Sequence, residues 1–226
     1  MGKIIAFANQ KGGVGKTTTA INLAAALSER GKRVLLCDFD PQGNATSGFG
    51  VDPRSLETSV YDLIVSEDPD TKSGIVQTKW VDIIGANVNL AGAELDLIGM
   101  DHREARLKLV LDKVKDEYDY VFIDCPPSLG LLTLNCLCAA DSFLVPLQCE
   151  YYALEGLSQL MTTVRMVKKN MNPKLSLEGV LLTMFDGRTN LSIQVVEEVK
   201  KHFPGEVFAS VVPRNVRLSE APSHGK

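Results

Sequence analysis

The sequence of 226 residues contains no apolar run that approaches the roughly 20 residues of a membrane-spanning helix. Its start lacks a charged segment followed by an apolar stretch and a small-residue cleavage site, which is the pattern of a secretory leader. Internal repeats and low-complexity linkers are absent as well. We therefore expect a single domain, residues 1–226, that stays in the cytoplasm and has no membrane as a partner.

Cysteines are few, and none stands at the paired spacings of a zinc site or a disulfide framework. All of them lie in or beside apolar segments, which predicts reduced and mostly buried thiols at Cys37, Cys125, Cys136, Cys138 and Cys149. The net charge of −4 argues against a protein that coats DNA by bulk charge. It leaves open a local basic patch that contacts DNA.

Short apolar segments alternate with segments of helical spacing along most of the chain. Strands are predicted at 3–8, 33–38, 81–84, 120–123, 142–146, 177–183 and 208–211, and helices at 18–30, 103–115, 153–169 and 191–202. Strands separated by helices are joined by right-handed crossovers, so we expect an α/β fold with a mostly parallel twisted sheet and helices on both faces. The stretch 51–78, rich in Asp, Ser and Pro, is expected to be a variable surface excursion.

A glycine-rich segment follows the first predicted strand, at the sheet edge where ligands of such folds bind. It consists of Lys11, Gly12, Gly13, Val14, Gly15, Lys16, Thr17 and Thr18. Glycines let backbone N–H groups surround phosphate oxygens, and the positive end of the following helix points to the same place. Lys16 is placed to reach the β- and γ-phosphates of ATP, and Thr17 to give Mg²⁺ a hydroxyl ligand. Gln10 replaces the first glycine of the general P-loop motif, and the alternative is a turn that only connects strand and helix.

Two further predicted strands end in carboxylates. Asp124 ends the strand that begins at Tyr120, where it can reach a magnesium-bound water. Asp38 and Asp40 end the second strand, where one can orient the attacking water and the other can support the metal's coordination shell. The alternative is that these side chains only cap turns. Beside the P-loop, they favour a site that binds ATP and Mg²⁺ and hydrolyses ATP.

The sequence resembles one family over essentially its whole length. Lys11 to Thr18 looks like the deviant Walker A box, in which a second, signature lysine precedes the glycines. Other segments resemble the ParA/Soj chromosome- and plasmid-partitioning ATPases, most strongly the chromosomal Soj branch, and these segments are 38–44, 124–128, 150–156, 183–190 and 213–222. The resemblance implies a P-loop NTPase fold of the deviant Walker A type.

The same resemblance implies a switch driven by ATP. ATP is expected to join two subunits into a homodimer that binds double-stranded DNA without sequence preference. A ParB/Spo0J-type partner protein would then stimulate hydrolysis and release. In this way the protein would segregate chromosome or plasmid DNA, in association with the nucleoid.

The matched motifs also imply roles for single residues in catalysis. Lys11 is expected to reach the phosphates of the partner subunit, as an arginine finger does, and to act with Lys16 and Asp40. Asp40 resembles the residue that positions the hydrolytic water. Asp38 resembles a residue that supports the metal site. Thr17 and Asp124 are the other residues expected at the metal. From the residues alone, a solvated Lys11 remains the alternative.

Resemblance assigns two further sets of residues. Met184, Pro213 and Asn215 resemble contacts on the adenine side of the nucleotide, although Met184 also ends an apolar strand and fits a core position. Arg188 and Arg217 match DNA-binding arginines of Soj-like proteins, and guanidinium groups suit phosphate contacts. The alternative is that both arginines are only solvated.

Departures from the family leave other functions to consider. Soj-like proteins continue past Ser223 to Lys226 into a further helix, so we expect the C-terminal helix of the family to be missing. A MinD-like membrane-cycling ATPase is the alternative function, but it needs an amphipathic C-terminal helix, and none precedes Lys226. A nitrogenase-reductase-like carrier would use Cys125 and needs a second cluster ligand. A tyrosine kinase needs a tyrosine-rich tail, and a scaffold would bind ATP without hydrolysing it.

Overall fold

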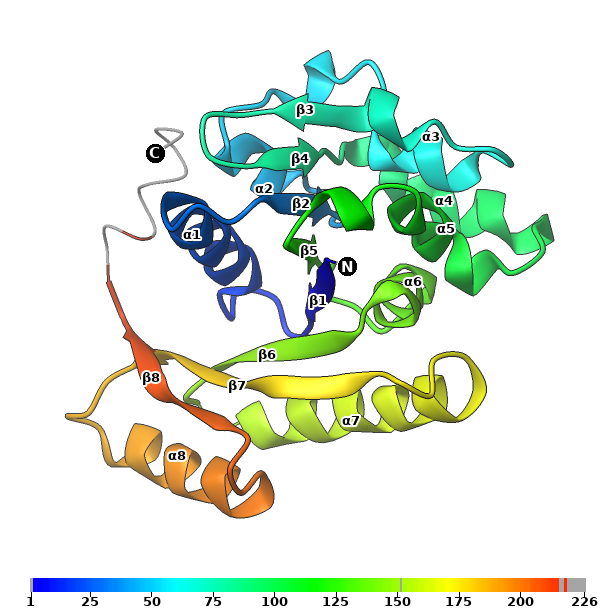
Figure 1. Cartoon of the computed structure of the whole chain (residues 1–226). Coiled ribbons are helices and arrows are strands. Elements are labelled where there is room, and N and C mark those ends of the chain that lie inside the picture. The colour runs from blue at the N-terminus through cyan, green and yellow to red at the C-terminus, as the bar shows by residue number, and fades with distance from the viewer. Residues whose placement is uncertain (1, 151, 216–217, 219–226) are drawn as a thin grey trace.

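The computed structural model describes residues 2–150, 152–215 and 218. Its described strands form one sheet in the order β3-β4-β2-β5-β1-β6-β7-β8 (Figure 1). The strands are β1 (Lys3–Phe7), β2 (Val34–Asp38), β3 (Ile75–Gln77), β4 (Asp82–Ile84), β5 (Tyr120–Asp124), β6 (Ser142–Gln148), β7 (Ser176–Phe185) and β8 (Val207–Pro213). All paired strands are parallel except β3 and β4, so the predicted mostly parallel sheet is confirmed.

Helices cover both faces of this sheet, but unequally (Figure 1). On one face lie α1 (Lys16–Glu29) and α2 (Asn44–Gly48). On the other lie α3 (Val60–Val65), α4 (Ala93–Asp96), α5 (Arg106–Asp112), α6 (Leu131–Ala139), α7 (Ala153–Asn170) and α8 (Asn190–His202). Among the described residues, none of these helices has both the length and the apolar character needed to cross a membrane.

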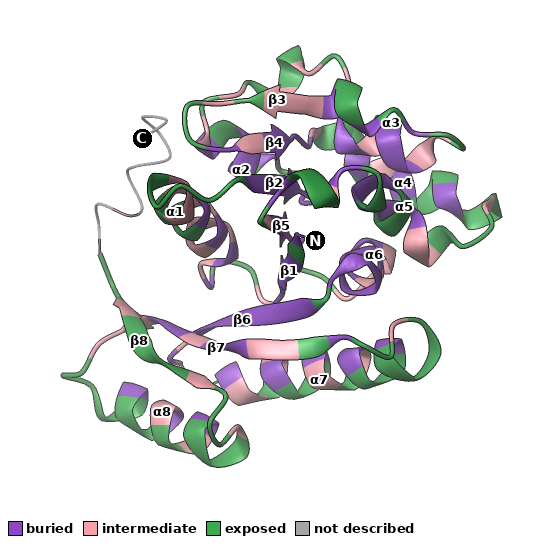
Figure 2. Cartoon of the chain, viewed as in Figure 1, coloured by how far each residue is buried: buried purple, intermediate pink, exposed green. Residues whose placement is uncertain are grey.

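The centre of the sheet is buried on both faces, as Figure 2 shows for β1, β5 and β6. Along β1, Ile4 packs into the core under the larger group of helices, and Ile5 and Phe7 pack into the core under α1. The Phe7 ring meets the edge of Phe122 on β5, with centroids 5.0 Å apart. Since parallel strands buried on both faces carry continuous apolar runs, this packing explains the apolar segments of the sequence.

Strand register brings the carboxyl ends of three central strands together. Phe7 on β1 and Asp38 on β2 both pair with Asp124 at the end of β5. The loop after β1 and the carboxylates of β2 and β5 therefore meet at one edge of the sheet. This is the position in which open α/β folds bind their ligands.

The prediction that 51–78 is a surface excursion was wrong in part. This stretch contains α3, whose Val60, Leu63 and Ile64 are buried in the core, and the antiparallel strand β3. Ser59 and Asp62 form a capping box that starts α3 within polar sequence. The structure contains all the predicted strands, with bounds shifted by no more than two residues. The same holds for the predicted helices 18–30, 153–169 and 191–202.

The predicted helix 103–115 is interrupted. It divides into a 3-10 turn (Arg103–Ala105), α5, and a second 3-10 turn (Lys115–Glu117). Arg106 is buried and donates hydrogen bonds to the carbonyls of Ile64 and Ser66, which joins α5 to α3. The prediction of buried, unpaired cysteines agrees with the structure for all five thiols.

Candidate nucleotide site

The loop between β1 and α1 has the backbone of a phosphate cradle. Gly13 and Gly15 have φ angles of 73° and 89°, in the left-handed region that favours glycine. Gly15 is the N-cap of α1, and no side chain caps this helix end, so N–H groups of its first turn remain available to a ligand. The hydroxyl of Thr183 on β7 donates to the carbonyl of Val14 at 2.8 Å, which holds the loop against the sheet.

Lys16 lies inside this loop. Its side chain is buried, and its ammonium donates to the carbonyl of Lys11 at 3.2 Å. Burial lowers the pKa of Lys16, while the nearby Asp124, Cys125 and Asp40 act in the opposite direction. A buried ammonium at a helix N-terminus is suited to binding an anion such as a nucleotide phosphate.

Asp38 and Asp124 face this loop in very different states, although both are fully buried. Asp38 accepts three hydrogen bonds, from the backbone N–H of Asp40 at 3.2 Å and from the N–H and hydroxyl of Thr46 at 2.8 and 2.7 Å. Both oxygens of Asp124 lack a hydrogen-bond partner among the described residues. This difference favours Asp124 for the metal and a supporting role for Asp38.

The ionisation of Asp124 reflects this isolation. Burial first, and then the neighbouring carboxylate of Asp38, raise its pKa well above the usual range, while Thr17 and Lys16 favour the charged form. Buried polar atoms in native proteins are nearly always hydrogen-bonded, so an isolated carboxylate indicates a group that the chain itself does not supply. A divalent cation beside a phosphate would fit this carboxylate.

A hollow of about 250 Å³ lies beside the phosphate loop. The P-loop forms one wall, and Asp40, Gln42, Asn44, Pro127 and Met184 complete it. Asp40 is largely buried, and its Oδ1 accepts the backbone N–H of Gln42 at 3.0 Å. The described residues form no group of three or more His, Cys, Asp or Glu side chains that could hold a metal. Mg²⁺ commonly binds through few protein ligands together with phosphate and water, so the residues fit ATP with Mg²⁺.

Of the residues expected on the adenine side, Met184 is among those that line this hollow, whereas Pro213 and Asn215 are not. Met184 lines it and has a φ of 50°, which is strained for a side chain of this size. Pro213 ends β8, where it pairs with Phe185 beside Met184. Asn215 follows two residues later and is exposed. Pairing of β7 with β8 thus brings these segments to the same side of the site.

Lys11 is placed differently from Lys16. Its ammonium forms an ion pair with Glu150, in the segment between β6 and α7, and its side chain is 39% exposed. The side chain of Asn9 accepts the backbone N–H of Lys11 at 3.0 Å, which fixes the start of the loop. Sequence reasoning assigned no role to Glu150, although it begins one of the matched segments.

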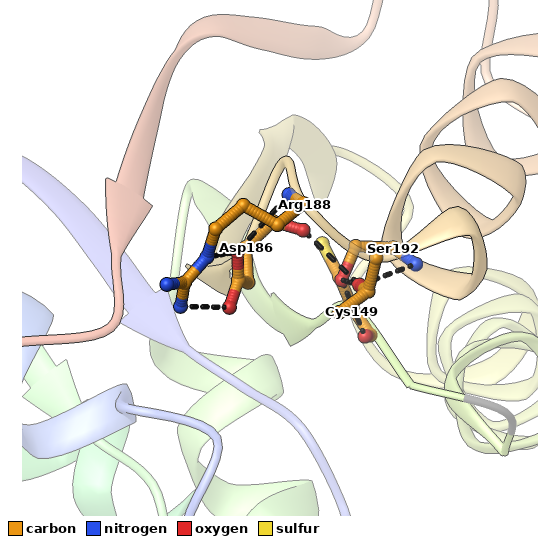
Figure 3. Close-up of polar contacts among 5 residues, drawn as sticks. Cys149, Asp186, Arg188 and Ser192 are labelled. Carbon is orange, nitrogen blue, oxygen red and sulfur yellow. Dashed lines mark hydrogen bonds and ion pairs between the residues drawn. The ribbon is translucent and has the colours of Figure 1, made fainter.

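Arg188 lies in the loop between β7 and α8, at the surface (Figure 3). It donates to both carboxylate oxygens of Asp186, at 2.9 and 2.7 Å, while its side chain is 90% exposed. These hydrogen bonds lower the pKa of Asp186 to about 2. Arg214, which sequence reasoning did not select although it adjoins Pro213, is exposed and adds a smaller effect on Asp186. Arg217 lies outside the described residues.

Comparisons with known proteins agree with this geometry. A family model described as an AAA domain matches residues 2–177. The chain is 62% identical to the sporulation initiation inhibitor protein Soj of Bacillus subtilis, over 100% of this chain and 90% of that protein. It is 55% identical to the chromosome partitioning protein ParA of Myxococcus xanthus, over 100% and 80%. A solved structure from Mycobacterium smegmatis, described as cobyrinic acid a,c-diamide synthase with bound ATP analog and magnesium, is similar with a TM-score of 0.90 at 40% identity, covering 100% of this chain and 93% of that one.

Proposed function

Because this chain belongs to the family of Soj/ParA chromosome-partitioning ATPases, we propose that it works as a switch in which ATP joins two copies into a DNA-binding dimer. It is an ATPase, and its cofactors are ATP and Mg²⁺. In the proposed cycle the dimer binds double-stranded DNA of any sequence on the nucleoid, in the cytoplasm. A ParB-type partner stimulates hydrolysis, which returns the subunits to the unbound state.

Residue roles in this proposal follow the geometry of the nucleotide site. Lys16 neutralises phosphate charge, and Thr17 and Asp124 hold Mg²⁺ with support from Asp38. Asp40, at the wall of the hollow, orients the attacking water. The adenine contacts are Met184, Pro213 and Asn215.

The position of Lys11 is the main observation that supports the proposed ATP-dependent dimer. Lys16 already fills the interior of the phosphate loop, whereas the side chain of Lys11 pairs with Glu150 outside it and is partly exposed. A second cation at the entrance of the phosphate site is not needed to neutralise the phosphates of its own subunit, because Lys16 already does so. It is suited to neutralising charge on a nucleotide held by another copy, as an arginine finger does.

Sedimentation velocity with Mg²⁺ and a non-hydrolysable ATP analogue tests this function. The protein should be dimeric with the analogue and monomeric with ADP, and it should bind unrelated duplex DNA sequences equally in the dimeric state only. Lys11→Ala is the matched control, since it should bind the analogue in the monomer and fail to dimerise. Nucleotide-independent dimers, or a Lys11→Ala dimer as tight as wild type, would contradict the proposal.

The synthase activity named for the Mycobacterium smegmatis protein is not extended to this chain. Relatives named as partitioning proteins share more of its sequence. A test for DNA binding therefore comes before any test for amide formation.

A further inference from the structure

The start of the phosphate loop is tied to the segment around the β6–α7 junction by three side-chain contacts. Asn9 donates to the carbonyl of Pro146 at 2.8 Å, Gln10 donates to the side chain of Gln159 on α7, and Lys11 forms its ion pair with Glu150. Gln10, which replaces a glycine of the general motif, thus has a structural use. The third contact occupies the ammonium that the proposed dimer needs.

Glu150 holds one side of this ion pair with an atom that water does not reach. Its Oε1 atom is shielded from solvent and lies against the ammonium of Lys11, its charged partner among the described residues. About a third of the Glu150 side chain is exposed. Moving Lys11 away would therefore leave a shielded carboxylate oxygen without a partner, which has a free-energy cost.

We propose that Glu150 is a positioning residue that holds Lys11 within its own subunit until the nucleotide phosphates of a second subunit compete for it. The inference rests on the proposed dimer switch. The ammonium of Lys11 gives up its ion pair with Glu150 when it moves to phosphates across the interface. ATP offers more negative charge than ADP, so the exchange of partners favours the ATP state. Glu150 thereby suppresses dimers that lack ATP.

The expected effect follows from the exposure of the pair. A partly exposed ion pair contributes a factor of about two to five to an equilibrium constant. Each dimer must release two such pairs. Glu150→Gln should therefore strengthen dimerisation with Mg²⁺ and the ATP analogue by about fourfold to twenty-fivefold, because glutamine keeps the size of the side chain and removes its charge.

Sedimentation equilibrium of wild type, Glu150→Gln and Gln159→Ala, at saturating analogue, measures this effect. Gln159→Ala is the matched control, because it removes the neighbouring contact to Gln10 without freeing Lys11, and its dimerisation constant should equal that of wild type. Nucleotide affinity of the monomers should be the same in all three proteins. Thermal unfolding checks that each variant is folded.

A second measurement reports on the ion pair without a dimer. In nucleotide-free protein, labelling of Lys11 by an amine reagent, followed by mass spectrometry, should be faster in Glu150→Gln than in wild type. Labelling of Lys11 in Gln159→Ala should remain at the wild-type rate. Equal labelling in all three proteins would overturn the assignment.

Failure of this inference can be told apart from failure of the dimer switch. If wild type dimerises with the analogue and Glu150→Gln dimerises equally or more weakly, the switch stands and the role of Glu150 is overturned. If neither protein dimerises, the switch and the role of Glu150 fail together. A dimer of Glu150→Gln under conditions that leave wild type monomeric would support both.

Discussion

Two aspartates at the ends of parallel strands in the same sheet have opposite environments. Asp124, at the end of β5, is fully buried and lacks a hydrogen-bond partner among the described residues, and burial raises its pKa. Asp186 follows β7, where the hydrogen bonds of Arg188 lower its pKa to about 2. Among the described residues the first carboxylate has no hydrogen bond, whereas the second is held by two from Arg188.

The comparison separates two uses of the same sheet edge. Burial without a partner is costly, so the region around Asp124 is arranged for a ligand that arrives from outside. Pairing at the surface costs little, so Arg188 can exchange Asp186 for another anion such as a DNA phosphate. We expect the buried region to control nucleotide binding and the exposed region to adjust the affinity for DNA.

Among the variants that test this comparison, loss of the cation inside the phosphate loop should have the largest effect, and the effect should be on ATP affinity. Lys16→Ala removes the buried ammonium near Asp124, and ATP affinity should fall by more than about 100-fold, or about 3 kcal/mol. Isothermal titration calorimetry measures it. Lys11→Ala is the control, because that side chain pairs with Glu150 and should leave ATP affinity of the monomer unchanged. ATP binding by Lys16→Ala at wild-type affinity would mean that the buried region is not the phosphate site.

A second variant separates binding from chemistry in the buried region. Asp40→Ala should keep ATP affinity within about threefold and slow turnover by about 10²- to 10⁴-fold, because a positioned carboxylate orients water without holding the nucleotide. Phosphate release and calorimetry give the two quantities. Size-exclusion chromatography with ATP should show a persistent dimer. Unchanged hydrolysis would remove Asp40 from the proposed set.

Neutralising each aspartate of the pair tests the comparison directly. Asp124→Asn should raise the free energy of unfolding of the nucleotide-free protein by about 1 kcal/mol and remove the added stability from Mg²⁺ with ATP. Asp186→Asn, the matched surface change, should leave the free energy of unfolding almost unaltered. Urea denaturation with and without Mg²⁺–ATP measures both. A destabilised Asp124→Asn would show that the carboxylate already has a favourable partner.

The effect at Asp124 should depend on pH in a defined direction. Its pKa is higher in the folded protein than in the unfolded chain, where it is about 3.9. Above that value the folded state holds the proton more strongly, so this group lowers stability as pH rises. The gain from Asp124→Asn should therefore be larger at pH 8 than at pH 5.

The smallest expected effect concerns the exposed pair. Arg188→Ala should weaken DNA binding by about threefold to tenfold and reduce the salt slope by about one, with ATP affinity unchanged. Carbon NMR of the Asp186 carboxyl should show its pKa return from about 2 towards about 3.9. Arg217→Ala is the companion variant, expected to weaken DNA binding as well. If both variants bind DNA as wild type does, the two arginines are only solvated.

Local patterns predicted most of the nucleotide site. Glycines, Lys16 and Thr17 stand next to one another in the chain, and Asp124 ends an apolar strand, so short-range sequence was sufficient. The Lys11–Glu150 pair joins residues that are far apart in the chain, and no spacing rule connects them. The positive φ of Met184 likewise depends on how β7 meets the site, which the sequence of β7 does not express.

The difference between local and long-range patterns also explains which helices the sequence failed to predict. Composition hid α3, because its buried residues stand within polar sequence. Helix α6 gave no periodic signal, since it is apolar on nearly all sides and almost entirely buried. Surface helices such as α7 and α8 have one buried face, so their spacing was readable from the sequence.

The order of the strands has a consequence for how the protein is made. Strand β1 pairs with β5 and β6, which are synthesised more than a hundred residues after it. Parallel pairing over such separations is slow, because the chain must close a long loop before any contact forms. The glycine loop leaves the ribosome early, but Pro127 and Met184, which line the hollow beside it, are synthesised after β5 and near the end of β7. ATP therefore cannot guide the first steps of folding, and the first nucleotide bound by a nascent chain would mark a completed core.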